Sequence, residues 1–158
     1  MAIYLKLGDI NGDATHQGHQ NWMRINNMNL GIRRKIRTKA GVSTNREGRQ
    51  PAISPVRLTK RSCQATPLLM TQALAGSKSK TAVIHVVETG SGGRTYIELT
   101  LSNVLVSHYQ IVGDEGRPLE SFQLDATKIE MRYVPSGGDN SASGPMAASY
   151  DMATSQSA

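Results

Sequence analysis

Two aspartates and two histidines crowd the N-terminal segment and are the side chains best suited to hold a metal: Asp9, Asp13, His16 and His19. Together with Asn11, the aspartates resemble the opening of a calcium-binding loop. Such a loop needs glycine at its sixth position and glutamate at its twelfth, where this chain has Ala14 and Gln20. Cysteine ligands or a helical pair of histidines, which would favour zinc, are missing from the segment. We interpret the segment as a hydrogen-bonded turn and expect no metal and no cofactor.

The other reactive side chains give little sign of an enzyme. Cys63 is the single cysteine, so an internal disulfide is excluded, and a free cysteine usually behaves as a small buried apolar residue. His85 and His108 fall in apolar, strand-like stretches, where a hydrogen-bonded structural histidine is the expected role. The sequence has no nucleophile elbow, phosphate loop or dinucleotide fingerprint. A cysteine–histidine pair stays open on sequence alone, but nothing near Cys63 suggests thiol activation. We expect a protein that is not an enzyme.

Basic residues form the strongest charge cluster of the chain. They are Arg33, Arg34, Lys35, Arg37, Lys39, Arg46, Arg49, Arg57, Lys60 and Arg61. Such a strip suits the phosphates of nucleic acid. Proteins that bind single strands also stack bases on aromatic side chains, and residues 30–70 contain none. A monomeric basic β-barrel that binds single-stranded nucleic acid is therefore the rival hypothesis, beside a solvated surface and an electrostatic contact between proteins.

Charge is divided unevenly along the chain. Residues 1–80 carry 14 Lys and Arg against 3 Asp and Glu, a net charge of +11. Residues 81–158 carry 4 against 9, a net charge of −5, and the two values sum to the +6 of the whole chain. This asymmetry favours an anionic partner, or self-association in which opposite faces meet. The alternative is that the two halves interleave in space and mix their charges on the surface.

The pattern of apolar residues indicates the fold class. With 158 residues the chain is long enough for one domain with a substantial core. Apolar and polar residues mostly alternate at the period of a strand. We predict a mainly β fold, a small antiparallel β-barrel of two packed sheets. No stretch reaches the roughly 18 apolar residues of a membrane span, and the N-terminus lacks the regions of a signal peptide. We expect no membrane insertion.

One short helix and one long loop interrupt the strands. We predict the helix at about residues 67–75, with Thr66 as its N-cap, Pro67 in its first turn and Gly76 as its left-handed stop. Residues 38–52 have little apolar content, which predicts a long extended loop.

Two further details of the pattern lead to specific predictions. Met28, Leu30, Ile32 and Ile36 share one parity, which predicts a long amphipathic strand. The apolar parity changes late in the chain, so a bulge is predicted near Ala126 and Thr127. We divide the chain into a barrel domain, residues 1–135, and a Ser/Gly-rich tail, residues 136–158, whose end we expect to form a short strand.

Several segments, in order along nearly the whole chain, resemble the haemolysin-coregulated proteins (Hcp), the tube subunits of type VI secretion systems. The similar segments are residues 3–12 (IYLKLGDING), 66–70 (TPLLM), 75–78 (AGSK), 101–107 (LSNVLVS), 129–135 (IEMRYVP) and 150–152 (YDM). The resemblance implies a β-barrel with one helix that forms six-membered rings. These rings stack into a hollow tube, which a contractile sheath propels out of the cell.

The resemblance also implies partners and a location. The partners are further copies in a homo-hexamer, the sheath, spike and baseplate components of the secretion machine, and small effectors carried in the lumen. The protein would be cytoplasmic before firing and then secreted without an N-terminal signal peptide. We assign no residues to the lumen or to cargo.

By the same analogy, the loop at about 38–52 reaches the neighbouring ring of the stack. We predict that Arg46, Glu47 and Arg49 form the stacking contact. The uneven charge suggests that they dock on an acidic surface of another subunit, built from Asp114, Glu115, Glu120 and Glu130.

Overall fold

The computed structural model describes residues 1–41, 50–76, 78–90, 92–113, 115–135 and 144–158. Within these ranges the chain forms one helix, α1 (Thr66–Ala75), and twelve strands. The strands are β1 (Ala2–Leu7), β2 (Met23–Ile25), β3 (Asn27–Asn29), β4 (Ile32–Arg33), β5 (Ala52–Ile53), β6 (Val56–Arg61), β7 (Lys80–Val87), β8 (Thr95–Val112), β9 (Leu119–Asp125), β10 (Lys128–Tyr133), β11 (Met146–Asp151) and β12 (Gln156–Ser157).

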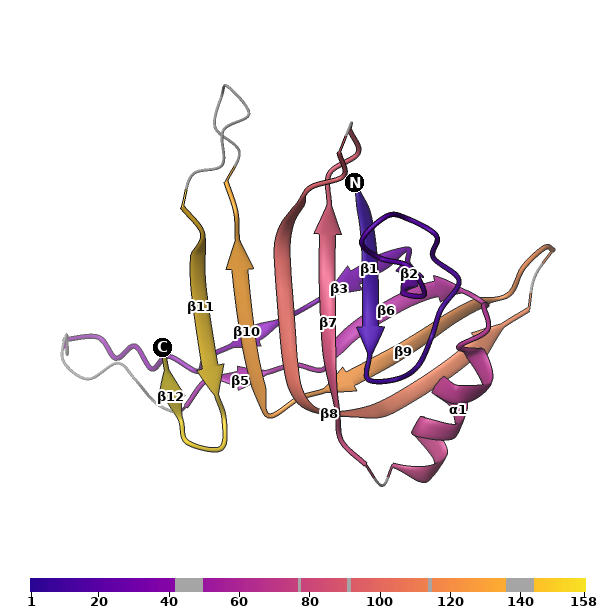
Figure 1. Ribbon diagram of the computed structural model, residues 1–158. Coiled ribbons are helices and arrows are strands. Elements are labelled where there is room, and N and C mark those ends of the chain that lie inside the picture. Colours follow the sequence, from indigo (N-terminus) through magenta and orange to yellow (C-terminus); the bar gives the residue numbers. More distant parts are fainter. Residues whose placement is uncertain (42–49, 77, 91, 114, 136–143) are drawn as a thin grey trace.

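Strand β8 is 18 residues long and belongs to both main layers of the fold. Its first part pairs with β7 on one edge and with β10 on the other, and its second part pairs with β9. One layer therefore has the order β12-β11-β10-β8-β7-β1-β2, and the other continues from β8 through β9 and β6 to β3. Figure 1 shows β8 running down beside β7 and then bending at its lower end to run beside β9.

The core fills the space between these two layers. Each layer contributes alternate residues of its strands, as the two-residue period requires. Leu5, Ile84 and Leu99 from the first layer are fully buried, and so are Leu58 and Phe122 from the second. The mainly β fold, the two packed sheets and the single short helix are thus confirmed.

The two layers meet again at Asn26, but the sheet does not close there. The backbone N–H of Asn26 donates to the carbonyl of Thr59, at 2.7 Å. Strand β2 pairs only with β1, and β3 pairs only with β6, among the strands that the structure describes. The architecture is therefore an open barrel-like sandwich, because no ladder joins β2 to β6.

Helix α1 lies where the sequence predicts it, but its N-terminus is capped differently. The N-cap is Ala65, which makes no side-chain capping bond, and Pro67 lies in the first turn. The Thr66 hydroxyl, predicted as the cap, instead accepts the N–H of Cys63 and donates to Glu120. Gly76 ends the helix with φ +51°, a left-handed conformation that favours glycine. No helix of the described chain is long and apolar enough to cross a membrane.

Two of the strand predictions are wrong. The expected long strand through Met28 and Ile36 is divided into β3 and β4, because β3 pairs with β6 and β4 pairs with β5. The parity change near Ala126 is not a bulge inside one strand. It marks the passage between β9, in one layer, and β10, in the other. Register shifts lie instead along β8, in its pairing with β9 between Val106 and His108 and in its pairing with β7.

Part of the predicted tail is joined to the first sheet. Strand β11 pairs with the whole of β10, and β12 pairs with the end of β11. The side chain of Tyr150 packs against the core. These C-terminal residues therefore extend the sheet that residues 1–135 begin.

A buried ion pair lies at the end of the second sheet, beneath the start of α1. Lys60 of β6 and Glu120 of β9 are directly opposite in the ladder, and the Lys60 Nζ and Glu120 Oε2 atoms are 2.6 Å apart. Both side chains have no exposed surface. They continue the inward rows of Val56 and Leu58 on β6 and of Phe122 on β9.

Further polar contacts surround this pair. The Lys60 ammonium also donates to the Arg61 carbonyl at 3.2 Å and to the Cys63 Sγ atom at 3.3 Å. Thr66 at the start of α1 donates to the Glu120 carboxylate. Burial raises the pKa of nearby Tyr109, and the charge of Glu120 raises it further. A buried charge is tolerated only when it is paired and hydrogen-bonded, and these contacts meet that condition.

We expect Glu120→Ala to destabilise the protein by about 3–5 kcal/mol, because it leaves the Lys60 charge buried without its partner. The measurement is the free energy of unfolding in a urea titration. The double variant Lys60→Met with Glu120→Leu removes both charges and should recover most of this loss.

Asp9→Ala is the matched control, since Lys80 and Asp9 form a pair of the same 2.6 Å length at the surface. We expect almost no change in stability there, because exposed pairs contribute little. An equal loss of stability in the Asp9 and Glu120 variants would contradict the role assigned to burial.

Candidate functional site

The acidic and basic residues predicted to form stacking contacts have different outcomes. Arg46, Glu47, Arg49 and Asp114 lie outside the described residues. Glu115 and Glu130 are exposed. Glu120 is not part of an exposed acidic surface, because its carboxylate is fully buried against Lys60. The parity it shares with Phe122 and Leu124 was the sequence signal for this burial.

The basic strip begins on a two-stranded ribbon that flanks the predicted loop. Strands β4 and β5 pair only with each other among the described strands. Residues 32–41 are all exposed, and they reach away from the two main layers (Figure 1). Ile32 and Ile36 keep 65% and 60% of their surface exposed. A basic arm with exposed apolar residues is a surface suited to contact with another molecule.

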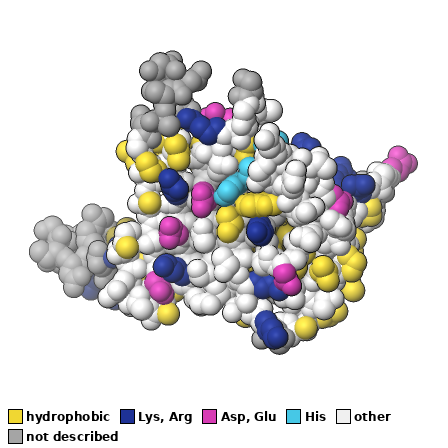
Figure 2. All heavy atoms as spheres, viewed as in Figure 1, with side chains coloured by type: hydrophobic (Ala, Val, Ile, Leu, Met, Phe, Trp, Pro, Cys, Tyr) yellow, Lys and Arg dark blue, Asp and Glu magenta, His cyan; other side chains and the backbone are white. Residues whose placement is uncertain are grey.

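On the body of the molecule the two charge types are interspersed. Figure 2 shows Lys and Arg side chains next to Asp and Glu side chains across the face in view. Ion pairs of this kind include Lys80 with Asp9 and Arg94 with Glu88. Each of these two pairs joins residues of the same half of the chain, so the mixing of charges between the two halves stays a prediction.

Strands β10 and β11 extend the first sheet beyond the core. After Ile129, the residues of β10 are exposed, and so are the first residues of β11. Met131, Tyr133 and Met146 have 39%, 43% and 70% of their surface exposed. Tyr133 is directly opposite Met146 in the ladder, and Met131 lies two residues before Tyr133, so all three lie on one face. We call these three residues the β10–β11 patch.

Other apolar side chains are exposed at the opposite end of the molecule. Leu68, Met70 and Leu74 of α1 are exposed, since the helix buries only Leu69. The hairpin end of β8 and β9 exposes Ile111 and Val112. Single exposed apolar residues are normal, but several in one region indicate an interaction surface.

Three histidines meet beside the first sheet, although they are far apart in sequence. His16 Nδ1 is 3.3 Å from His19 Nδ1, and His19 Nε2 is 2.9 Å from His85 Nδ1. The His19 ring stacks on Tyr4, with ring centroids 4.6 Å apart. Trp22 packs against His19 and His85. The cluster therefore fastens the loop of residues 11–22 to β1 and β7.

In the sequence these histidines fall separately in a predicted turn and in a predicted strand, and no pattern of residues brings them together. The three rings contact one another in sequence, His16 with His19 and His19 with His85, and do not surround a shared point where a metal ion could bind. In the described residues, no group of three or more potential ligands has metal-binding geometry. Gly93 closes the outer side with φ +52°, where a Cβ atom would come within 2.7 Å of His16 Nε2. Only glycine fits this position without displacing the ring.

Burial controls the protonation of the cluster. It lowers the pKa of His19, and the charges of His85 and His16 lower it further. Burial also lowers the pKa of His85, against the opposing effect of Glu98, whose Oε2 atom is 3.7 Å from His85 Nε2. Both rings are therefore neutral at pH 7, which suits a contact between two imidazoles.

We expect the protein to lose stability as the pH falls below the ordinary histidine pKa of about 6.5. In that range the unfolded chain binds more protons than the folded chain, so acid favours unfolding. Each histidine contributes at most about 1.4 kcal/mol per pH unit. The measurement is the free energy of unfolding at pH 7.5 and at pH 5.5.

The variant His85→Gln should reduce the difference in the free energy of unfolding between the two pH values, because it removes one of the half-buried titrating rings. His108→Gln is the control, since His108 is exposed on β8. A wild-type protein with equal stability at both pH values would disprove the assigned role of the cluster.

Comparison with known proteins identifies the family. Residues 4–133 match the family model described as "Type VI secretion system effector, Hcp". No curated protein sequence matches the chain. Among solved structures, one described as a type six secretion system protein has a TM-score of 0.92 and 21% identity, and each chain is covered over 99% of its length.

Two further solved structures show the same fold. Hcp1 from Salmonella typhimurium has a TM-score of 0.79 and 19% identity, with 99% of this chain and 98% of that chain covered. A type VI secretion system effector from Yersinia pestis has a TM-score of 0.75 and 19% identity, with 94% and 98% covered. The family match spans most of the residues, and the resemblance seen in the sequence is confirmed. The chain belongs to the Hcp family, the tube proteins of type VI secretion systems.

Proposed function

We propose that this chain is the structural subunit of a type VI secretion inner tube. In this role it forms hexameric rings, the rings stack into a hollow tube, and the tube carries small effectors and is itself secreted. The protein acts by assembly and not as an enzyme. The observation that carries the proposal, beside family membership, is the β10–β11 extension, which leaves apolar side chains uncovered at the sheet margin.

The β10–β11 patch supports a contact between subunits. An isolated chain gains nothing from a sheet that continues past its own core, because a sheet needs a packed layer on at least one face. A neighbouring copy can supply that layer. In a closed ring each copy uses two different surfaces, one for each neighbour. We assign the β10–β11 patch to one of these surfaces.

Ring stacking uses a different part of the chain. We propose that the loop at about 38–52 contacts the next ring through Arg46, Glu47 and Arg49. Its acidic counterparts are Asp114, Glu115 and Glu130, without the buried Glu120. The basic ribbon of β4 and β5 supports this assignment, because it holds the flanks of the loop away from the main layers.

The other partners of the protein and its location follow from the proposed role in a type VI secretion system. We propose that the tube contacts the sheath, the spike and the baseplate, and that the protein is cytoplasmic before firing and secreted afterwards without an N-terminal signal peptide. Family membership supports this proposal.

We expect the purified protein to form annular particles in negative-stain microscopy and hexamers in native mass spectrometry. The variant Met131→Glu with Met146→Glu should give folded monomers, because two buried carboxylates would oppose the contact. Circular dichroism checks that the variant is folded.

Leu74→Glu is the matched control, since Leu74 is 79% exposed on α1 and lies outside the patch. If rings form in the Met131→Glu with Met146→Glu variant but not in the Leu74→Glu variant, the ring contact involves α1, and our assignment is contradicted. A wild-type monomer at every concentration that binds single-stranded DNA would instead support the rival function.

We also expect Arg46→Glu with Arg49→Glu to leave rings intact and to shorten tubes, because the charge of the stacking contact is reversed. Wild-type tubes should shorten in 1 M salt as well, since exposed charges are screened beyond about 3 Å there. Tube length is measured by electron microscopy, and Arg57→Glu is the control at an exposed site on β6.

Tubes of unchanged length in 1 M salt would contradict an electrostatic stacking contact. Monomers of the Arg46 and Arg49 variant in native mass spectrometry would contradict the separation of stacking from ring closure.

A further inference from the structure

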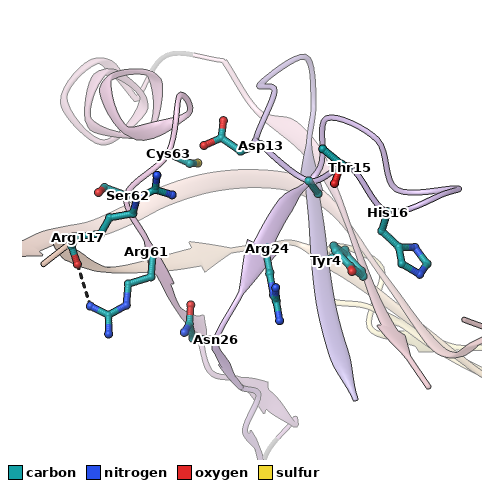
Figure 3. A pocket seen from close by; sticks show the side chains of 11 residues that line it. Tyr4, Asp13, Thr15, His16, Arg24, Asn26, Arg61, Ser62, Cys63 and Arg117 are labelled. Carbon is teal, nitrogen blue, oxygen red and sulfur yellow. Dashed lines mark hydrogen bonds between the residues drawn. The ribbon is translucent and has the colours of Figure 1, made fainter. Parts of the chain in front are cut away.

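A cleft of about 590 Å³ opens between the loop of residues 11–22 and strands β2 and β6. Three arginines line it, and each comes from a different part of the fold. Arg24 belongs to β2, Arg61 ends β6, and Arg117 lies in the turn before β9. Figure 3 shows Arg24 and Arg61 projecting on the same side of the strands, with Asn26 between them. The fold therefore brings together cations that lie far apart in the sequence.

The positive charge of this cleft is not balanced by the protein. Asp13 is the one carboxylate in its lining, and its Oδ1 atom accepts the N–H of Gln64 at 3.3 Å. Within the described chain, no carboxylate forms an ion pair with any of the three arginines. Lys60, Lys80 and Arg94 each have such a partner. Adjacent like charges repel one another, so an anion bound in the cleft would relieve that repulsion.

The neutral groups of the cleft add hydrogen-bond donors. They include the Asn26 amide, the Ser62 hydroxyl and the Tyr4 hydroxyl. Arg61 is held in place, because its Nη1 atom donates to the carbonyl of Arg117 at 2.8 Å (Figure 3). The same bond joins the end of β6 to the turn that carries the third arginine. The cleft is thus partly organised before any ligand arrives, which lowers the cost of binding.

We propose that this cleft binds a small polyanion with two or more phosphoryl or carboxyl groups. A guanidinium group presents a planar set of donors that matches both oxyanions in a bidentate manner. Two such groups, on β2 and β6, suit a ligand with two or more anionic groups, and Arg117 adds further positive charge to the lining. The volume lies within the usual range for small-molecule sites. The site is separate from the β10–β11 patch, so binding does not depend on the proposed ring contact.

Isothermal titration calorimetry at constant ionic strength tests the proposal, with tripolyphosphate and citrate as separate probes. We expect saturable binding of at least one probe at micromolar concentration. Arg24→Gln with Arg61→Gln should weaken it at least about tenfold, since it removes two charge-assisted contacts. Arg132→Gln is the matched control, because Arg132 is an exposed arginine on β10, outside the cleft. Binding of tripolyphosphate alone would assign the site to phosphoryl groups, and binding of citrate alone to carboxyl groups.

Three results would overturn the proposal. They are the absence of saturable binding, an equal loss of affinity in the Arg132 variant, and tighter binding of a single-stranded oligonucleotide than of either probe. Native mass spectrometry of the same samples records ring formation. Rings that assemble without any anion binding would refute the polyanion site and leave the proposed tube function intact.

Discussion

The sharing of β8 between two sheets is the constraint on which the rest of the structure depends. A strand of 18 residues spans roughly 60 Å when extended, which is longer than one layer of a small domain can use. The strand changes partners between Val104, which pairs with β7, and Leu105, which pairs with β9, and its two parts belong to different layers. Because both layers contain the same strand, they pack against each other with the core enclosed between them. Strands β9 and β10 then fall in opposite layers, although they are separated by only residues 126–127.

The two ends of the molecule differ in how the sheets finish there. At one end the inward rows of β6 and β9 finish in charged residues, and the Lys60–Glu120 pair with Thr66 closes the core under α1. At the other end β10 and β11 extend the first sheet, and only the last part of β11 packs against the core, so Met131, Tyr133 and Met146 stay exposed. The first end is satisfied within the chain. The second keeps exposed apolar side chains within the single chain, and it is the surface that we assign to the proposed contact between subunits.

The loop of residues 11–22 connects a structural cluster to a cleft. On one side the loop is fastened by His19, which contacts His16 and His85 and stacks on Tyr4. On the other side the same loop forms a wall of the arginine-lined cleft, where Tyr4 and His16 also contribute. The protonation of the cluster and the shape of the cleft are therefore physically linked, since one loop takes part in both. The contact between the neutral His19 and His85 rings holds this wall against β7 at pH 7.

Local patterns in the sequence determined the strand-rich fold, the position of α1 and its end at Gly76, because alternation and helix termination depend on neighbouring residues. The segments that resemble the Hcp family, which occur in the family's order along the chain, likewise indicate the family from the sequence alone. The contacts between residues far apart in the sequence depend on which strands pair, and only the tertiary structure determines that pairing. Lys60 meets Glu120 across the β6–β9 ladder, and His19 meets His85 although 66 residues separate them. Residues that read as surface charges in the sequence were buried for the same reason. The identity of a strand's partner is a property of the whole chain, and no local period contains it.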